Sequence, residues 1–340
     1  MASSNSFANL QEESDALREA WMRHEETFLS DYLVSDVEDP RIHFPSLLTR
    51  GLLVESLLPG KQRDLIWQEY RFGLCMSFLQ KVARQRPGKQ TATHLRHALE
   101  QGLKEFKSMT IASYLQEAWD ELQQAAEEEH YLKQALDAWQ QTAWDGKQVQ
   151  ELLGTFMRRW AFTLHEQVTK PCVVLEPACG SANDYRSLAA CGLAAKVLYR
   201  GFDLCPKNIE NANRDYPQAA FEVGNIFDIP ASDKSADFLY VHDLFEHLSA
   251  KGMQRGFEEV ARVTRGMAVL SFFNAAYCPS HTIRPRDGYH WNRLSLGCLQ
   301  ETMKDLCCEA EVIHTASFLK NAFGCHDYHN PGSAALVLHF

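Results

Sequence analysis

Side chains that could do chemistry gather in four short segments of the second half of the chain. In the first segment, Val173–Tyr185, an apolar run ends at Glu176 and enters a turn of small residues. Small residues let the backbone approach a ligand closely, and a glycine would also relieve a tight turn. The turn lacks the G-x-G-x-x-G spacing of a pyrophosphate cradle, so a dinucleotide site is poorly supported. Its small residues are Ala178, Gly180, Ser181 and Ala182.

The second and third segments end in polar residues that suit a nucleoside. The run Tyr199–Asp203 ends in an acid, and a carboxylate there can accept two hydrogen bonds from a ribose diol. The alternative is that Asp203 caps a helix starting at Pro206. In the third segment, Asn225 offers a donor and an acceptor to an adenine edge, and Ile226 could pack on the ring. An asparagine that satisfies a turn is the alternative there.

The fourth segment, Ala236–Leu248, runs from an apolar stretch into a turn that holds two histidines. His242 is the first candidate for a general base, because it follows the strand and imidazole titrates near neutrality. The other interpretation is a strand-end residue that contacts a cofactor or is held by hydrogen bonds. Glu246 and His247 are interpreted as residues that cap and anchor the following helix.

A long polar insertion after the fifth predicted strand would overhang the same edge of the sheet, where long loops tend to be functional. Tyr277 and His290 from this insertion join His242 as candidate catalytic residues, and a surface-loop role is the alternative for each. Further candidate substrate contacts are His281 and, for an anionic group, Arg284 or Arg286. Near the end of the chain, residues 325–330 carry metal-capable side chains without zinc-type spacing, so no metal site is expected.

The elements that must position these residues alternate between strand and helix after residue 170. Such alternation predicts an α/β fold with a mostly parallel sheet covered on both faces. Strands are expected over 172–175, 197–202, 221–223, 236–241, 267–273, 311–318 and 334–340, and helices over 185–191, 206–214, 252–263 and 296–306. The last two strands, joined without a helix, should pair antiparallel at one edge.

Residues 1–165 are predicted to form a separate all-α domain in front of the α/β domain, which covers residues 166–340. Apolar residues recur at intervals of three and four over 10–32, 47–58, 64–82, 94–106, 111–139 and 149–165, with turn residues such as Pro45 at the breaks. Aromatic residues of this part, including Trp67 and Trp139, are interpreted mainly as its own core. The domain could wall a substrate pocket or form an oligomer interface.

The composition narrows the classes of partner. The formal net charge of -10, without a basic cluster, disfavours nucleic acid. No window approaches the roughly 20 apolar residues needed to span a bilayer. The first residues are polar and acidic, unlike a secretory signal. The cysteines form no C-x-x-C pair and are interpreted as reduced thiols, which favours a cytoplasmic protein.

Taken in order, the four segments resemble the class I S-adenosylmethionine-dependent methyltransferases, especially the broad group with a strand-end turn like "LEHL", matched here by Phe245–Leu248. The resemblance covers roughly residues 170–340. It implies a seven-stranded Rossmann-like sheet and S-adenosyl-L-methionine as the cofactor. The family usually has three glycines in the first turn, whereas this chain has Ala178 and Ala182 at two of those positions. Their methyl groups disfavour the backbone conformations that glycine allows.

The resemblance also implies roles for individual residues. Glu176 would begin the glycine-rich loop and help to orient the methionine amino group. Asp203 would hold the ribose hydroxyls, and the backbone around His242 would meet the methionine part. The remaining implied cofactor contacts are Ala178, Gly180 and Ala182 along the cofactor, Leu204 at the border of the adenine, and Asn225 and Ile226 against it.

The expected activity is methyl transfer to an oxygen or nitrogen of a small or medium-sized molecule. The displacement is in line, so the protein mainly positions the acceptor and excludes water. A dedicated base is needed only where the acceptor's proton must leave early. A nucleotide-binding oxidoreductase is one alternative, and a non-catalytic interaction protein with a relic methyltransferase fold is another. The sequence does not decide whether the protein forms a homo-oligomer through the helical domain.

Overall fold

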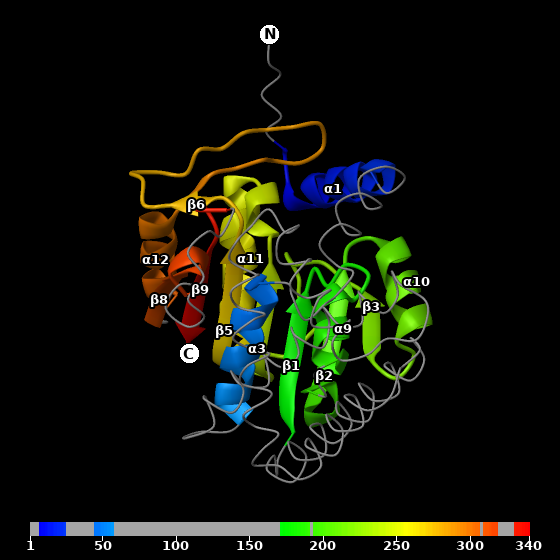
Figure 1. Cartoon of the computed structure of the whole chain (residues 1–340). Helices are drawn as coiled ribbons and strands as arrows, with labels where there is room; N and C mark the ends of the chain where they lie inside the picture. Colours follow the sequence, from blue (N-terminus) through cyan, green and yellow to red (C-terminus); the bar gives the residue numbers. More distant parts are fainter. Residues whose placement is uncertain (1–6, 25–43, 58–170, 191–192, 307–308, 319–329) are drawn as a thin grey trace, which may run out of the picture.

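The computed structural model describes residues 7–24, 44–57, 171–190, 193–306, 309–318 and 330–340 (Figure 1). The helices predicted between residues 58 and 165, with Trp67 and Trp139, lie outside the described residues, and so does most of the segment 325–330. The boundary at residue 165 therefore stays a prediction. None of the described helices is long and apolar enough to cross a lipid bilayer.

A seven-stranded sheet forms the centre of the described part, in the order β3-β2-β1-β4-β5-β9-β8. The first five strands in this order are parallel, and β9 is antiparallel to both β5 and β8. The predicted α/β fold with a mostly parallel sheet is therefore confirmed. The strands are β1 (Cys172–Pro177), β2 (Val197–Asp203), β3 (Ala220–Val223), β4 (Ala236–His242), β5 (Thr264–Phe272), β8 (Glu309–His314) and β9 (Ala334–His339).

Strand β8 ends earlier than its sequence predicts. The expected strand reaches residue 318, whereas β8 ends at His314 and residues 315–318 are helical. The last residue pair between the two closing strands joins His314 to Ala334, where β9 begins. Beyond that pair the ladder ends with one more backbone hydrogen bond, from the N–H of Thr315 to the carbonyl oxygen of Ser333 at 3.0 Å, and the hydroxyls of the same two residues lie 2.8 Å apart.

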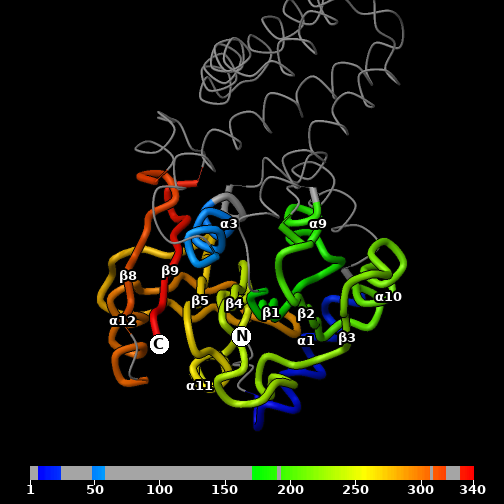
Figure 2. The backbone as a smooth tube through the Cα atoms, turned by 90° about the horizontal axis from the view of Figure 1, so that it is seen from below, coloured from blue at the N-terminus to red at the C-terminus, as the bar shows by residue number. Residues whose placement is uncertain are grey.

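Helices cover both faces of the sheet. Figure 2 shows α3 and α9 on one side of the row of strands and α11 on the other. On the second side, buried residues of the sheet form one apolar cluster with residues of α11 and α12, including Leu239, Val241, Phe257 and Leu299. The main helices are α1 (Leu10–His24), α3 (Phe44–Leu57), α9 (Asn183–Ala190), α10 (Pro206–Asp215), α11 (Ala250–Val263) and α12 (Leu296–Asp305).

The break expected at Pro45 is wrong. Helix α3 begins at Phe44, so Pro45 lies inside its first turn. A proline is tolerated there, because the first N–H groups of a helix have no partner within the helix and the fixed φ of proline suits helical geometry. A proline in the sequence can thus mark either a break between two helices or the first turn of a helix.

Helix α1 packs on the α/β unit and does not stand apart from it (Figure 1). The carboxylate of Glu13, whose residue is 1% exposed, accepts hydrogen bonds from the N–H and the hydroxyl of Ser249, both at 2.6 Å. Ser249 is the N-cap of α11, and negative charge at a helix N-terminus is stabilising. The first helix of the predicted all-α domain is therefore fastened to the α/β domain.

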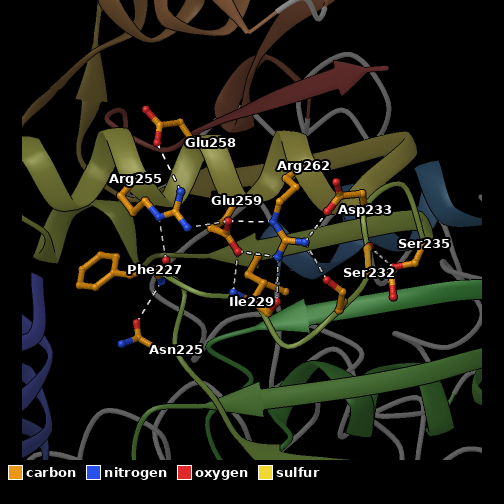
Figure 3. Close-up of polar contacts among 11 residues, drawn as sticks. Asn225, Phe227, Ile229, Ser232, Asp233, Ser235, Arg255, Glu258, Glu259 and Arg262 are labelled. Carbon is orange, nitrogen blue, oxygen red and sulfur yellow. Dashed lines mark hydrogen bonds and ion pairs between the residues drawn. The ribbon is translucent and has the colours of Figure 1, made fainter.

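Charged side chains of α11 form hydrogen bonds to the backbone of the loop that follows β3 (Figure 3). The side chain of Glu259 is 1% exposed, accepts a hydrogen bond from the N–H of Ile229 at 2.7 Å, and pairs with Arg255 and Arg262 at 2.9 and 2.7 Å. Arg255 also donates to the carbonyl of Phe227 at 2.8 Å. The loop that carries both predicted adenine contacts is thus held in place from α11.

The substitution Glu259→Gln should lower the free energy of unfolding by about 2 kcal/mol, because a buried charged acceptor is lost. Burial by itself raises the pKa of Glu259, but hydrogen bonds from Arg262 and Ile229 outweigh burial and the net pKa lies below its usual 4.5. A lowered pKa stabilises the folded state above the unfolded-state value and stops doing so as the pH falls through the folded-state value. In urea unfolding, the difference between wild type and variant should therefore shrink below about pH 4.5.

The neighbouring Glu258 provides the matched control. Its side chain is 41% exposed and lies 3.6 Å from Arg255. Because exposed ion pairs contribute little, Glu258→Gln should change the free energy of unfolding by less than about 0.5 kcal/mol. Equal losses for the two substitutions would contradict the fastening role of Glu259.

Candidate functional site

A cavity of about 260 Å³ lies at the carboxyl ends of β1, β2 and β4, with Leu17 and Trp21 of α1 in its wall. Ligands of open α/β sheets bind at this edge. Four of the predicted site residues do not line it: Glu176, Ala182, Tyr277 and His290. Those that do are Ala178, Gly180, Asp203, Leu204, Asn225, Ile226 and His242.

The turn after β1 takes the left-handed backbone at every second residue. Ala178, Gly180 and Ala182 have φ angles of 60°, 54° and 70°, so two alanines hold conformations that a Cβ atom disfavours. A Cβ atom added to Gly180 would meet no atom within 4 Å, since that side of the turn faces the cavity. The chain therefore keeps the backbone path of a glycine-rich turn with only one glycine in it.

Asp203, the last residue of β2, ties this turn to the sheet. Its Oδ2 accepts a hydrogen bond from the N–H of Gly180 at 3.0 Å, and its Oδ1 accepts from the N–H of Cys205 at 2.8 Å and from Asn208 at 3.1 Å. Burial raises the pKa of Asp203, and these three hydrogen bonds oppose that rise. A carboxylate has about four acceptor positions, so one is left for a ligand. Asp203 can thus hold the start of α10 and accept a hydrogen bond from one ribose hydroxyl, but not the two that its place in the sequence suggested.

The side-chain amide of Asn225 is engaged at both ends by the protein. Its Nδ2 donates to the hydroxyl of Ser14 in α1 at 2.7 Å, and its Oδ1 accepts from the N–H of Phe227 at 3.0 Å. This geometry favours the interpretation of Asn225 as a residue that satisfies a turn, and it adds a contact to α1. Leu204 and Ile226 line the cavity as apolar surfaces, which is the property that packing against an adenine requires.

Glu176 lies beneath the turn and faces two tyrosines. Its Oε2 accepts hydrogen bonds from the hydroxyls of Tyr199 at 2.5 Å and Tyr240 at 2.6 Å. Burial, helped by the charge of Asp184, raises the pKa of Glu176 to about 8. The carboxyl group thus links β1, β2 and β4. Because Glu176 does not line the cavity, it could influence a bound methionine only by positioning the turn after β1.

His242 lines the cavity, but both of its ring nitrogens have partners. Nδ1 lies 2.9 Å from Oδ2 of Asp184 in α9, and Nε2 lies 2.9 Å from the hydroxyl of Thr49 in α3. Burial lowers the pKa of His242, while the charge and hydrogen bond of Asp184 raise it, and the net pKa is raised. The ring joins β4 to two helices, which favours a hydrogen-bonded strand-end residue over a general base.

Sequence reasoning missed the cavity's aromatic wall around His247. The ring centroid of His247 lies 5.6 Å from Trp21, 5.6 Å from Phe273 and 5.4 Å from Trp291, and all four residues line the cavity. Its Nδ1 lies 3.1 Å from the carbonyl oxygen of His290. The one local signal is Phe273, an aromatic residue directly after a strand. That Trp21 and Trp291 join it cannot be read from sequence spacing.

Two acids of the turn after β4 are shielded from water. Asp243 lines the cavity with a φ of 52°, and burial raises its pKa although His242 opposes the rise. Glu246 is fully buried and accepts a hydrogen bond from the N–H of Phe273 at 2.6 Å. Burial and the charge of Asp243 raise the pKa of Glu246 as well. Glu246 therefore ties the turn to the backbone after β5, and the expectation that Glu246 caps the following helix is wrong, because Ser249 is the N-cap of α11.

The insertion after β5 runs beside α1 at one end of the sheet (Figure 1), and both contribute residues to the cavity wall: Leu17 and Trp21 from α1, and Trp291 from the insertion. At its base, β6 (Ala275–Ala276) pairs with β7 (Leu294–Ser295). Near its tip, Gly288 has a φ of 85°, and a Cβ atom there would lie 3.0 Å from the carbonyl oxygen of Ala16 in α1. The insertion and α1 thus form a common roof over the sheet edge, where the sequence placed an overhang.

The candidate catalytic residues of the insertion point elsewhere. Tyr277 is 63% exposed, and its ring packs 5.8 Å from that of His314. The imidazole of His290 is buried, and its Nδ1 has no hydrogen-bond partner among the described residues. Arg284 and Arg286 are exposed and do not line the cavity. The structure therefore does not bring Tyr277 or His290 to the cavity wall with His242.

The charge of the cavity wall is negative. Asp203 and Asp243 line it, and no lysine or arginine of the described segments does. Within the same segments, no three His, Cys, Asp or Glu side chains are grouped so that they could hold a metal ion. The wall thus offers hydrogen-bond acceptors and aromatic faces.

Residues 174–266 match the model of a family described as a methyltransferase domain. No curated protein sequence matches the chain. Among solved structures, the chain is similar to an S-adenosylmethionine-dependent methyltransferase from Mesorhizobium loti, at 14% identity over 50% of this chain and 92% of that one, with a TM-score of 0.39. It is also similar to magnesium protoporphyrin IX methyltransferase from Synechocystis PCC 6803 with bound SAM, at 13% identity over 56% of this chain and 78% of that one, with a TM-score of 0.37.

The substitution Ala178→Gly should raise the free energy of unfolding by about 0.5–1 kcal/mol. Glycine removes the roughly 1–2 kcal/mol that a Cβ atom costs in the left-handed conformation. Glycine also gives the unfolded chain more conformational freedom, which lowers the free energy of unfolding by about 0.4–1 kcal/mol. Urea unfolding of the purified protein measures the balance.

Ala231→Gly is the control for this substitution, since Ala231 lies in the loop after β3 and is not among the residues with positive φ. It should lower the free energy of unfolding by about 0.4–1 kcal/mol through the unfolded chain, with a further loss from the Ala231 methyl group, which packs against the core. A loss of the same size for Ala178→Gly would show that the turn after β1 is not strained.

Proposed function

We propose that this chain, in which residues 174–266 form a class I methyltransferase domain, binds S-adenosyl-L-methionine in the cavity at the carboxyl ends of β1, β2 and β4. It would transfer the methyl group to an oxygen or nitrogen of a small or medium-sized molecule. The observation that carries the proposal is the hydrogen bond between Gly180 and Asp203, which sets an open turn and a ribose-binding carboxylate side by side in one cavity.

The residues present fit such a donor. The space above Gly180 is open, so a ligand can lie directly against the turn. Asp203 lines the cavity and keeps one acceptor position, and Leu204 and Ile226 offer apolar contact surfaces to a base. Asp243 adds negative charge to the same wall, which suits a ligand that carries a sulfonium cation.

When bound, S-adenosylmethionine supplies a sulfonium methyl group for in-line displacement. The chain's own contribution is to hold the reacting atoms in line and to exclude water. Asp203 and the turn at Gly180 would hold the nucleoside, and the backbone at His242 would hold the methionine part. Water would be excluded on the acceptor side by the aromatic wall of Trp21, Phe273 and Trp291.

A small acceptor is proposed because α1 and the insertion cover the cavity from two directions, and enclosed sites of this kind suit small ligands. The net charge of -10 continues to disfavour nucleic acid as a partner. Cys172 and Cys179 are buried free thiols, which supports the proposal of a cytoplasmic protein. The other segments before β1 that the sequence predicts to be helical are proposed as a further wall of the site or as an oligomer interface.

The substitution Asp203→Ala should weaken binding of S-adenosylhomocysteine by about 1.5–3 kcal/mol, the scale of a hydrogen bond to a charged group. Calorimetry measures the affinity, and circular dichroism checks the fold, since Asp203 also supports the turn. Asp215→Ala, at an acid that ends α10 and lies 48% exposed, is the control and should leave affinity unchanged. Unchanged affinity for Asp203→Ala would remove it from the ribose role, and tighter binding of NADH than of S-adenosylhomocysteine would favour an oxidoreductase.

The substitution Gly180→Val should abolish binding of S-adenosylhomocysteine while the protein stays folded. The branched side chain would fill the open space above the turn, and it also suits the φ of 54° poorly. Gly180→Ala should weaken binding less. Gly297→Ala in α12, where an added Cβ atom meets only Ser295 at 3.9 Å, is the control. Normal binding by Gly180→Val would place the donor site elsewhere.

A further inference from the structure

The protein fixes His247 in one tautomer. Its Nδ1 lies 3.1 Å from the main-chain carbonyl oxygen of His290, and a carbonyl oxygen can only accept a hydrogen bond. Nδ1 therefore carries a proton. Burial lowers the pKa of His247, so the ring is neutral at pH 7 and its lone pair lies on Nε2.

The lone pair on Nε2 is available to a ligand. Among the described residues nothing forms a hydrogen bond to Nε2, yet this atom is not one of the polar atoms sealed from solvent without a partner. His247 lines the cavity, which is the side from which a ligand would approach this atom. A neutral imidazole with a fixed tautomer and an accessible lone pair is the form that a general base requires.

Among the described residues, no other histidine or acid that lines the cavity offers the same combination. Both ring nitrogens of His242 are held by Asp184 and Thr49. Glu246 is turned toward backbone N–H groups and is not part of the wall. Asp243 lies in the wall as an acid on the same turn, and its charge interacts with those of His242 and Asp184.

The titratable groups on the elements packed against His247 are few. Asp243 and Glu246 share its turn, and Glu13 approaches from α1, where it is committed to Ser249. The insertion adds Tyr289, whose ring centroid lies 5.9 Å from that of His247. The other insertion residue is His290, whose carbonyl oxygen accepts the Nδ1 hydrogen bond.

The wall around His247 suits a flat, uncharged ring. Trp21, Phe273 and Trp291 present aromatic surfaces, and a second aromatic ring packs well on such surfaces. A carboxylate or phosphate on the acceptor would find no lysine or arginine in the described wall, and it would be repelled by Asp243. The acceptor group beside Nε2 is therefore not an anion, and a base at Nε2 serves an acceptor that carries a proton to be removed.

We propose that the methyl acceptor is a flat aromatic molecule with a phenolic hydroxyl group, and that Nε2 of His247 takes the hydroxyl proton. This rests on the proposed methyl-transfer function. The phenol oxygen forms a bond to the methyl carbon, and the carbon–sulfur bond breaks with its electron pair staying on sulfur as a neutral thioether. The hydroxyl proton moves to Nε2, and the imidazolium then releases it to solvent.

The full chain would be assayed with tritium-labelled S-adenosylmethionine and three probes: naphthol, naphthylmethylamine and naphthoic acid. Tritium should enter naphthol in preference to the amine and the acid. His247→Gln should lower kcat with naphthol about 100-fold, the usual scale of general base catalysis, and leave the Kd of S-adenosylhomocysteine within about twofold. The acid limb of the wild-type pH profile should vanish in this variant. His339→Gln, at an exposed histidine of β9, is the control and should match wild type.

A second measurement does not depend on turnover. Nuclear magnetic resonance of protein with isotope-labelled histidine, assigned by the signal that His247→Gln removes, should show the Nδ1–H tautomer and a titration midpoint below the usual 6.5. An Nε2–H tautomer, or naphthol methylation that survives His247→Gln, would overturn the base role. Transfer only to the amine or the acid, or to no probe while the donor binds, would overturn the phenol acceptor. Failure of wild type to bind S-adenosylhomocysteine would instead overturn the proposed function itself.

Discussion

The carboxylate of Asp203 is the point on which the candidate site depends. It accepts hydrogen bonds from Gly180 in the turn after β1 and from Cys205 at the start of α10, so one side chain fixes two loops that leave adjacent strands. The turn needs this support, because Ala178 and Ala182 hold left-handed conformations that their Cβ atoms disfavour. A site that lacks two of its usual glycines thus keeps its shape through tertiary hydrogen bonds.

Buried acids connect other parts of this acidic chain in the same way. Glu13 joins α1 to Ser249 at the start of α11, and Glu259 joins α11 to the loop after β3. Glu176 joins three strands through two tyrosine hydroxyls. Each carboxyl group meets N–H or O–H donors from another element, which offsets the cost of removing it from water. The link through Glu13 matters most for the site, since it places Trp21 over the cavity.

Two histidines five residues apart along the turn after β4 have opposite environments. His242 is enclosed by Asp184 and Thr49 and serves as a structural link among β4, α9 and α3. His247 has one nitrogen held by a carbonyl oxygen and the other left toward the cavity. Both residues are histidines at or just after the end of β4. Only the partners supplied by distant helices and by the insertion distinguish the structural histidine, His242, from the proposed base, His247.

The sequence by itself determined the order of strands and helices after residue 170 and the edge at which Gly180, Asp203 and His242 would meet. Local apolar periodicity reports secondary structure, and parallel strands bring their carboxyl ends to one edge, so both follow from residues close in the chain. Tertiary structure alone decided that Asn225 bonds to Ser14 and that Tyr277 faces away. Such contacts join residues up to 236 positions apart, and packing, which no local pattern encodes, selects the partners.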